Sequence, residues 1–525
     1  MNAILILFGG NLSGEAFEPL LNEKNSFYIS LEQAKKFPGV KKTVLLAPSE
    51  NFNNLDLNNL DGVEIEQAAA PWTKRSLLEK IAGLEAGFDC VYFAFADCPF
   101  LDPAIAGAMA DRHTRYAAEY SYADGWPYGL APEILSPGTA AILAKISGDD
   151  GPVERDILFS VIQKDINAFD IETEISPVDL RCHRLNLCAD SKRNLLLLNN
   201  FIFAAGGIIP DTSRVEKIIE EQPQILRTLP AFYPIQVSGS CPQKCSICPY
   251  PLYTDTTARK DFMETDRFES LLEKIAAFSG DAVIDLSLWG ELSLHPEKMK
   301  LIEAVLSRRE LALVIETSGI GWKAQELEMC AELSQKAQPR KNSMPPLSWI
   351  VSFDTLDPKR YAELRGNGYV EAETCAKKLL SLFPKDCYVQ AVRVAGAEDD
   401  TEKFYRYWKE NAPSGEKNII IQKYDDFCGI MEKKQASDIS PVIRQPCWHI
   451  MRDMPVLIDG TVPLCREELN FLKEQSDENS RSLGNVFTDS LESIWQKGIR
   501  YYSEHCKKNY TEICANCDEY YTYNF

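Results

Sequence analysis

Strand-like and helix-like patterns alternate regularly from residue 231 to about residue 435 of this 525-residue chain. The strand patterns are short apolar runs, and helical patterns such as those over 267–278 and 361–382 separate them. The expected strands cover residues 235–238, 282–289, 311–316, 349–353, 388–394 and 418–423. Six βα units in about 200 residues predict a partial TIM-like barrel, in which the C-terminal ends of the strands form the active face.

Three cysteines at the spacing CxxxCxxC follow the first expected strand: Cys241, Cys245 and Cys248. Three thiolates on one loop can hold three irons of a cubic [4Fe–4S] cluster and leave the fourth iron without a protein ligand. An open coordination position is what separates a catalytic metal site from a closed structural one. The loop therefore predicts a reactive cluster on the active face of the barrel.

Polar residues also follow the later strands. Gly290 and Glu291 come after the second strand, Thr317-Ser318-Gly319 after the third, and Ser352 after the fourth, with Arg365 a short distance beyond. Each of these alone is typical of an ordinary turn. Since the C-terminal ends of barrel strands meet on one face, their order along the chain indicates one shared pocket.

Together these features resemble the radical S-adenosylmethionine (radical SAM) enzymes. The resemblance implies that the open iron chelates the amino and carboxylate groups of SAM, that Gly290 and Glu291 receive the amino group, and that Ser352 contacts SAM. It also implies that Arg365 pairs with the SAM carboxylate, a geometry that suits a guanidinium fork. Trp289 and Leu292 stand where the family usually has a glycine and a proline, and Ile247 where it often has an aromatic residue.

A second group of cysteines closes the chain. Cys447, Gly460 and Cys465 give C-x12-G-x4-C, and Cys514 and Cys517 give C-x2-C. This arrangement resembles the opening of the SPASM domain and, because no cysteine follows Cys517, its shortened "twitch" form with one auxiliary [4Fe–4S] cluster on those four cysteines. A structural zinc ion would use the same four thiolates and is the alternative. Two cysteines, Cys428 and Cys506, are spare, and we expect a structural role for both. For Cys428, a role as a ligand or a hydrogen-atom donor is the alternative.

The first part of the chain has the pattern of a separate α/β domain, with buried strands expected at 4–8, 42–47 and 90–96. Asp97 follows the third strand, where ligands bind in open α/β sheets. These features resemble a sugar-nucleotide nucleotidyltransferase domain. Its first loop, residues 9–15, lacks a basic residue that would clamp a triphosphate, so we expect a degenerate domain that binds or docks something.

The expected organisation has four parts. They are a nucleotidyltransferase-like domain at 1–200, a linker at 201–230 with glycine and proline breaks, a radical SAM core at 231–435 and an auxiliary Fe–S domain at 436–525. The fold class is α/β, with an N-terminal α/β sandwich, a central (β/α)6 partial barrel and a small C-terminal Fe–S domain. This three-domain order is also similar to that of a spirochaete family named for its SPASM domain.

Charge and cysteine content narrow the functional classes. The net charge is −21, which argues against a nucleic-acid partner, and we expect no membrane span and no signal peptide. Sixteen cysteines with only five histidines, in a chain expected in the cytoplasm, indicate metal sites rather than disulfides.

The resemblance implies reductive cleavage of SAM to a 5′-deoxyadenosyl radical that abstracts a hydrogen atom from a peptide or a sugar- or nucleotide-linked substrate. It also implies anaerobic chemistry, with electrons from a donor such as flavodoxin or ferredoxin. Two alternatives stay open: an active nucleotidyltransferase with an appended Fe–S module, and a non-catalytic Fe–S redox sensor.

Overall fold

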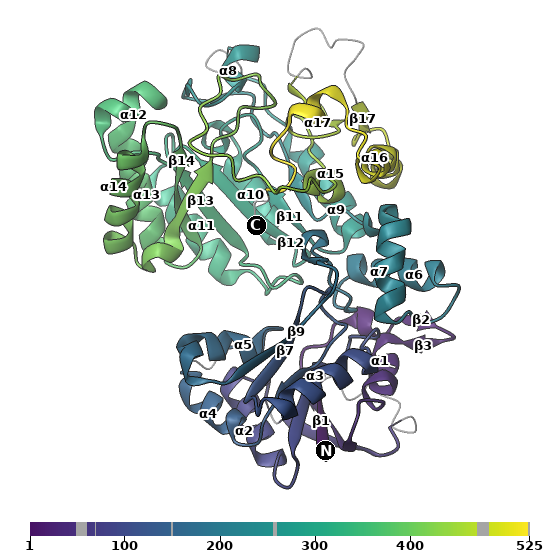
Figure 1. The fold of residues 1–525 in the computed structure, drawn as a ribbon. Helices are drawn as coiled ribbons and strands as arrows, with labels where there is room; N and C mark the ends of the chain where they lie inside the picture. Colours follow the sequence, from purple (N-terminus) through teal and green to yellow (C-terminus); the bar gives the residue numbers. More distant parts are fainter. Residues whose placement is uncertain (49–59, 69, 149–150, 256–259, 470–481, 523–525) are drawn as a thin grey trace. The chain divides into compact units, whose positions relative to one another are not determined.

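The computed structural model divides the chain into two compact units, Met1–Thr228 and Leu229–Phe525 (Figure 1). It describes residues 1–48, 60–68, 70–148, 151–255, 260–469 and 482–522. Within those ranges, no helix combines the length and the apolar character that a membrane crossing requires.

The first unit is built on a seven-stranded mixed sheet in the order β5-β4-β1-β6-β8-β7-β9. Its strands are β1 (Ala3–Phe8), β4 (Val40–Pro48), β5 (Val63–Ala68), β6 (Cys90–Phe95), β7 (Tyr120–Asp124), β8 (Glu133–Leu135) and β9 (Ile171–Ile175). Strands β5, β4, β1 and β6 are parallel, and β8 runs antiparallel to both of its neighbours. Strands β1 and β6 are buried along their whole length, as expected of parallel strands covered on both faces.

Helices of the first unit continue beyond the sheet into the expected linker. They are α1 (Ser26–Ala34), α2 (Lys74–Leu84), α3 (Pro103–Arg115), α4 (Thr139–Ile146), α5 (Ile157–Ile162), α6 (Lys192–Ala204) and α7 (Thr212–Glu221). The buried carboxylate of Asp102, at the start of α3, accepts hydrogen bonds from the backbone N–H (2.9 Å) and the hydroxyl (2.6 Å) of Thr212, at the start of α7. The segment 201–228 is therefore folded as part of the first unit.

The second unit contains a six-stranded parallel sheet whose strands lie in chain order, which confirms the predicted partial barrel. The strands are β10 (Phe232–Pro234), β11 (Ala282–Asp285), β12 (Leu311–Thr317), β13 (Leu347–Ser352), β14 (Cys387–Arg393) and β15 (Ile419–Lys423). The helices between them are α8 (Tyr250–Tyr253), α9 (Thr265–Ser279), α10 (Lys298–Leu306), α11 (Ala324–Lys336), α12 (Pro358–Leu364), α13 (Tyr369–Leu382) and α14 (Glu398–Asn411). Figure 1 shows α13 and α14 beside β13 and β14.

Two expected elements differ in their bounds. The helix expected over 361–382 is broken between α12 and α13, because Gly366 and Gly368 adopt φ values of +94° and +106° that end one helix and begin the next. The first strand was expected at 235–238 but pairs with β11 only over Phe232–Pro234. Residues 235–238 are buried; Ile235 N–H still donates to the carbonyl of Asp285 in β11 (2.7 Å), and Gln236 N–H donates to the carbonyl of Val456 (2.9 Å) on the other side.

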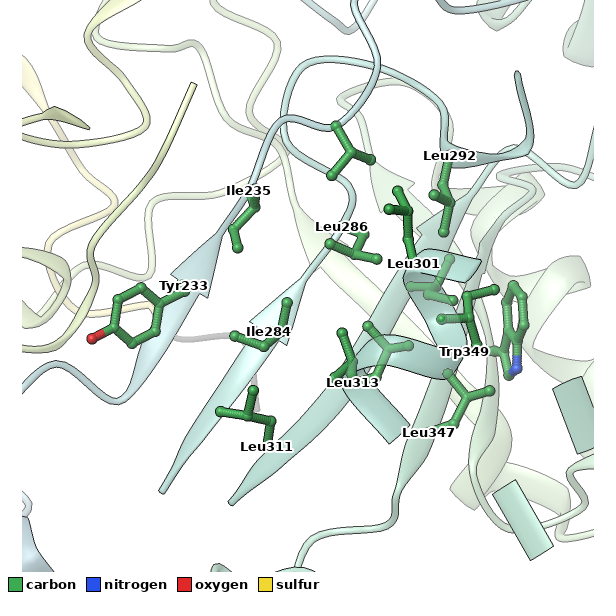
Figure 2. Close-up of a cluster of buried hydrophobic side chains, with 14 of the residues drawn as sticks. Tyr233, Ile235, Ile284, Leu286, Leu292, Leu301, Leu311, Leu313, Leu347 and Trp349 are labelled. Carbon is green, nitrogen blue, oxygen red and sulfur yellow. The ribbon is translucent and has the colours of Figure 1, made fainter. Parts of the chain in front are cut away.

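The barrel strands alternate their side chains between two apolar layers, as the period of a β-strand requires. Ile284, Leu313 and Trp349 come from three neighbouring strands and pack on the helix-covered face, where Leu301 of α10 joins them (Figure 2). The other face carries a smaller cluster, Phe232, Val283, Ala312, Val314 and Ile350, inside the curve of the sheet. This closed core fixes the strand ends, and hence the loops that follow them.

The C-terminal segment folds within the same compact unit as the barrel. It consists of α15 (Trp448–Arg452), the antiparallel pair β16 (Thr461–Pro463) and β17 (Ser482–Asn485), α16 (Leu491–Cys506) and α17 (Glu512–Asn516). The ammonium of Lys274 in α9 donates to the carbonyl of Val486 (2.6 Å), and α16 packs beside α9. The segment is thus held against the first βα unit of the barrel.

Candidate functional site: a cysteine-lined cavity and a second cysteine cluster

A cavity of about 270 Å³ opens at the C-terminal ends of the barrel strands. Every strand of the six contributes to its wall, either with its last residues or with the loop that follows. All seven residues predicted around the first cluster line it: Cys241, Cys245, Cys248, Gly290, Glu291, Ser352 and Arg365. The structure therefore brings together residues that are spread over more than a hundred positions of the sequence.

The loop that carries the three thiols is anchored to the turn between α12 and α13. Ser246 N–H donates to the carbonyl of Leu364 (2.8 Å), and the amide of Gln243 donates to the Tyr361 hydroxyl (3.0 Å) and the Asn367 carbonyl (3.3 Å). Burial raises the pKa of Cys248 to about 12, and burial also raises the pKa of Cys241 and Cys245. Thiolates at these positions thus need a nearby positive charge, such as that of iron.

Gly290 passes against the backbone of the segment before the cysteine loop. A Cβ atom on Gly290 would lie 1.8 Å from the carbonyl oxygen of Ser238, so only glycine fits. The next residue, Glu291, is buried and its carboxylate accepts from the Thr317 hydroxyl (2.6 Å) and the Ser318 N–H (2.8 Å). Glu291 thereby ties the loop after β11 to the turn after β12, while its side chain still borders the cavity.

Ser352 and Arg365 also line the cavity, and each already has a carboxylate partner. The hydroxyl of Ser352 donates to Oε1 of Glu316 (2.5 Å), which also accepts from the Gln390 amide (2.8 Å). The Nε atom of buried Arg365 donates to Asp354, whose other carboxylate oxygen accepts from Val392 N–H (2.8 Å). The charge of Asp354 offsets the burial of the guanidinium and raises the pKa of Arg365.

Aromatic side chains cover another part of the cavity. The Trp289 ring stacks on Tyr250 at a centroid distance of 6.1 Å and contacts Phe427 at 5.8 Å. Trp289 has a φ of +45°, in the left-handed region that favours glycine, so its backbone keeps the conformation that a glycine would adopt. Tryptophan in place of the family's usual glycine at this position therefore changes the lining of the cavity more than the path of the backbone.

Charged groups on the remaining wall come from β11, β15 and the C-terminal segment. Lys423 pairs with Asp518 (2.8 Å) and Glu519, and Arg466 pairs with Glu467 (2.9 Å). Asp285, at the end of β11, also lines the cavity, and burial raises its pKa to about 7. These groups give the cavity a polar region separate from the three thiols.

A second, much smaller cavity of about 20 Å³ lies among the C-terminal cysteines. Cys447, Cys465, Cys514 and Cys517 line it, as predicted for one auxiliary centre, and Cys428 lines it as well. Of the spare cysteines, Cys506 lies at the end of α16, and the described lining of neither cavity includes it. Glu467, Glu468 and His505 also line it, but the four predicted thiolates are by themselves a donor set that fits a closed cluster or a zinc ion.

Local chemistry explains how distant cysteines reach this cavity. Gly460 has a φ of +86°, and a Cβ atom there would lie 2.4 Å from the Phe487 ring, so the C-x12-G-x4-C spacing needs its glycine to turn the chain between Cys447 and Cys465. The guanidinium of Arg444 lies between the rings of Tyr510 (4.1 Å) and Tyr520 (4.6 Å) and donates to the carbonyl of Cys514 (2.5 Å). Arg444 thereby positions the C-x2-C segment.

The aspartate singled out in the first unit has an internal partner. The guanidinium of Arg155 binds both carboxylate oxygens of Asp97, at 3.0 and 2.6 Å, and its Nε donates to Asp190 (3.1 Å). The side chain of Asp97 is 2% exposed, and both of its carboxylate oxygens are already bound by the Arg155 cation. This geometry favours the expectation of a degenerate nucleotidyltransferase domain.

Sequence reasoning missed several residues of the larger cavity, among them Gln243, Asp285, Gln390 and Arg466. Asp285 and Gln390 had a usable signal, since each is a polar residue near the end of an apolar strand. Gln243 had none, because its partner Tyr361 lies more than a hundred residues away, and Arg466 had none, because it follows no expected strand.

Comparison with known proteins gives a family match at the C-terminus and one long relative. Residues 447–518 match the SPASM iron–sulfur cluster-binding domain. An uncharacterized protein of Treponema pallidum (strain Nichols) is 32% identical over 377 residues, which cover 70% of this chain and 98% of the relative.

Two solved structures show weaker similarity. Streptococcus suis SuiB bound to the precursor peptide SuiA is 14% identical, with a TM-score of 0.40, over 65% of this chain and 76% of that one. A cytidylyltransferase from Leptospira borgpetersenii is 18% identical, with a TM-score of 0.36, over 43% of this chain and 95% of that one.

The three-thiol loop on the active face of a parallel partial barrel and the matching SPASM segment occur together in one compact unit. The chain therefore belongs to the same family as the Treponema pallidum protein, and residues 447–518 form a SPASM iron–sulfur cluster-binding domain.

Proposed function

We propose that this protein cleaves S-adenosylmethionine reductively at a [4Fe–4S] cluster held by Cys241, Cys245 and Cys248. The observation that carries this proposal is the opening of one three-thiol loop into a cavity that is also lined by Gly290, Ser352 and Arg365. When bound, cluster and SAM supply an electron and a 5′-deoxyadenosyl radical that abstracts a hydrogen atom from the substrate. The protein contributes binding, orientation and the exclusion of water.

The chain's own residues divide these tasks. Gly290 lets the backbone after β11 pack against Ser238 and, with Glu291, would receive the SAM amino group, while the carboxylate of Glu291 borders the cavity and fixes that loop through Thr317 and Ser318. Ser352 offers its hydroxyl at the end of β13, and Arg365 presents the cation for the SAM carboxylate. The aromatic group of Tyr250, Trp289 and Phe427 keeps water from this part of the cavity.

The second cysteine group is proposed to hold one auxiliary [4Fe–4S] cluster on Cys447, Cys465, Cys514 and Cys517. Four thiolates saturate the four irons of such a cluster, so no iron is left open to a substrate. We therefore assign this centre to electron transfer with the substrate radical, and not to substrate binding.

The substrate class that suits the larger cavity is polar. Gln390, Gln422 and Tyr424 line it beside the paired groups Lys423 and Arg466. A peptide, or a sugar- or nucleotide-linked molecule, has the amide or hydroxyl groups that such a wall can bind, and a small donor such as flavodoxin or ferredoxin is the proposed source of electrons.

Electron paramagnetic resonance tests the SAM-binding part of this proposal without turnover. A variant in which Cys447, Cys465, Cys514 and Cys517 are replaced by alanine retains only the first cluster, with about four irons per chain. Adding SAM to the reduced variant should change the g values of this cluster, because SAM becomes a ligand of the open iron. An unchanged spectrum at saturating SAM would contradict the proposed site.

A further inference from the structure

Two cysteines of the first unit meet in its interior. Cys98 lies in the loop after β6, and Cys188 follows 90 residues later, shortly before α6. Their Sγ atoms are 3.1 Å apart, and the two residues are 2% and 0% exposed. The described linings of the two cysteine-lined cavities do not include them, so the clusters of the proposed function leave this pair of thiols unassigned.

Main-chain hydrogen bonds hold the two cysteines beside each other. Ala189 N–H, directly after Cys188, donates to the carbonyl of Asp97, directly before Cys98 (2.9 Å). The carbonyl of Ala189 in turn accepts from the hydroxyl of Ser13 (3.0 Å). The sulfurs are therefore close because the backbone brings their residues together, and not through a side-chain rotation alone.

A glycine allows a third segment to pack against the pair. Leu187 N–H donates to the carbonyl of Tyr128 (2.9 Å), and the residue after Tyr128 is Gly129, with a φ of +99°. A Cβ atom on Gly129 would lie 2.8 Å from the Leu187 carbonyl oxygen and 3.3 Å from the sulfur of Cys188. This packing confines the Cys188 sulfur to its position beside Cys98.

The separation of the thiols is close to what a disulfide requires. An S–S bond of about 2.05 Å would bring the two sulfurs only about 1 Å closer than they are as free thiols. A metal ion fits this place less well, because the third possible ligand, the Asp97 carboxylate, already binds the Arg155 cation through both oxygens.

We propose that Cys98 and Cys188 are a disulfide-forming pair, oxidised by a low-molecular-weight disulfide such as oxidised glutathione. One protein thiolate attacks the small disulfide and releases one small thiol; the second then attacks the resulting mixed disulfide and releases the other. The two cysteines lose two electrons and two protons, which the two released thiols carry. The new bond would join the segments of Asp97 and Asp190, the two carboxylates that bind Arg155.

The pair should react slowly in the folded protein. Burial raises the pKa of the Cys188 thiol, and the thiolate is the attacking species. Cys182, which is exposed, should therefore react first, and it should form only a mixed disulfide with glutathione.

Mass spectrometry tests the proposal on the full chain with its iron–sulfur clusters loaded. The protein is brought to equilibrium anaerobically with excess oxidised glutathione, and the remaining free thiols are then alkylated in denaturant. The digest should contain the Cys98 peptide joined to the Cys188 peptide, lighter by two hydrogen atoms than the two separate peptides. Dithiothreitol added before alkylation should separate them.

Cys90→Ser is the matched control, since it alters a buried cysteine of β6 in the same unit and should keep the joined peptide. Cys98→Ser should lack it. Free thiols at Cys98 and Cys188 at equilibrium would overturn the proposal, as would a stable glutathione adduct on either one or a joined peptide that forms only in denaturant. Failed SAM cleavage would leave this test unaffected, because the pair takes no part in the proposed function.

Discussion

At Gly290 the chain runs so close to the segment before the cysteine loop that the absence of a side chain decides the geometry. We expect Gly290→Ala to abolish SAM cleavage and to lower the free energy of unfolding by about 1–3 kcal/mol, because its Cβ would lie 1.8 Å from a backbone oxygen that cannot rotate away. Assay of 5′-deoxyadenosine and urea denaturation measure the two effects. Gly83→Ala is the control, since it has no atom within 4 Å of the new Cβ, and equal losses in both variants would contradict this account.

A buried histidine in the first unit predicts a pH dependence of stability. The His113 ring lies between the hydroxyls of Ser121 (2.8 Å) and Ser136 (3.0 Å), and burial lowers its pKa from 6.5 to about 4. The unfolded chain binds a proton at His113 more readily than the folded state does. The free energy of unfolding is therefore unaffected by His113 above pH 6.5 and decreases as the pH falls toward 4. The loss amounts to at most about 3 kcal/mol.

Urea denaturation between pH 4 and 7 checks this prediction against His113→Gln. The variant should show a weaker fall of the unfolding free energy over the acid range, because glutamine binds no proton in either state. Parallel pH profiles of the two proteins would show that His113 does not titrate as described.

The turn at Gly460, between Cys447 and β16, leads to a testable prediction about the auxiliary domain. Gly460→Ala combines a positive φ with a Cβ placed 2.4 Å from the Phe487 ring, so Cys465 should no longer reach its position. We expect iron to fall from about eight to about four atoms per chain. Gly206→Ala shares the positive φ but has no neighbour within 4 Å, and its iron content should stay near eight. Equal iron content in the two variants would argue against this role of Gly460.

The bounds of a strand could be predicted from the sequence where its apolar run is buried on both faces of the sheet. Strands β12, β13 and β14 lie within two residues of their expected bounds, because continuous apolar residues are typical of parallel strands. Strand β10 begins earlier than expected, and next to β11 it is bordered by the segment at Val456, a partner more than two hundred residues away. A pairing with a segment so distant in the chain has no local sequence signal.

Some residues of the site could also be predicted from the sequence. The three-cysteine loop and the positions of Gly290, Ser352 and Arg365 were predictable because parallel strands end on a common face. Their internal partners were not. The hydrogen bonds of Glu291 with Thr317 and Ser318, and the ion pair of Arg365 with Asp354, depend on tertiary packing.

At the scale of the whole molecule, we expect the chemistry of the second unit not to depend on the first. The bidentate contact of Arg155 engages both carboxylate oxygens of Asp97, the residue predicted to bind a metal ion in the first unit. We therefore expect no release of pyrophosphate from CTP or UTP with magnesium, and we expect Asp97→Ala to cleave SAM at the rate of the unaltered protein. Pyrophosphate release that Asp97→Ala abolishes would show that the first unit is an active nucleotidyltransferase.

The central claim is that Cys241, Cys245 and Cys248 hold a cluster that cleaves SAM, and production of 5′-deoxyadenosine tests it most directly. The protein, reconstituted anaerobically and reduced with dithionite, should convert SAM to 5′-deoxyadenosine and methionine. Cys245→Ala should form none, while Cys375→Ala, which alters a buried cysteine of α13, should retain the activity. Formation of 5′-deoxyadenosine by Cys245→Ala, or none by the fully loaded unaltered protein, would contradict the claim.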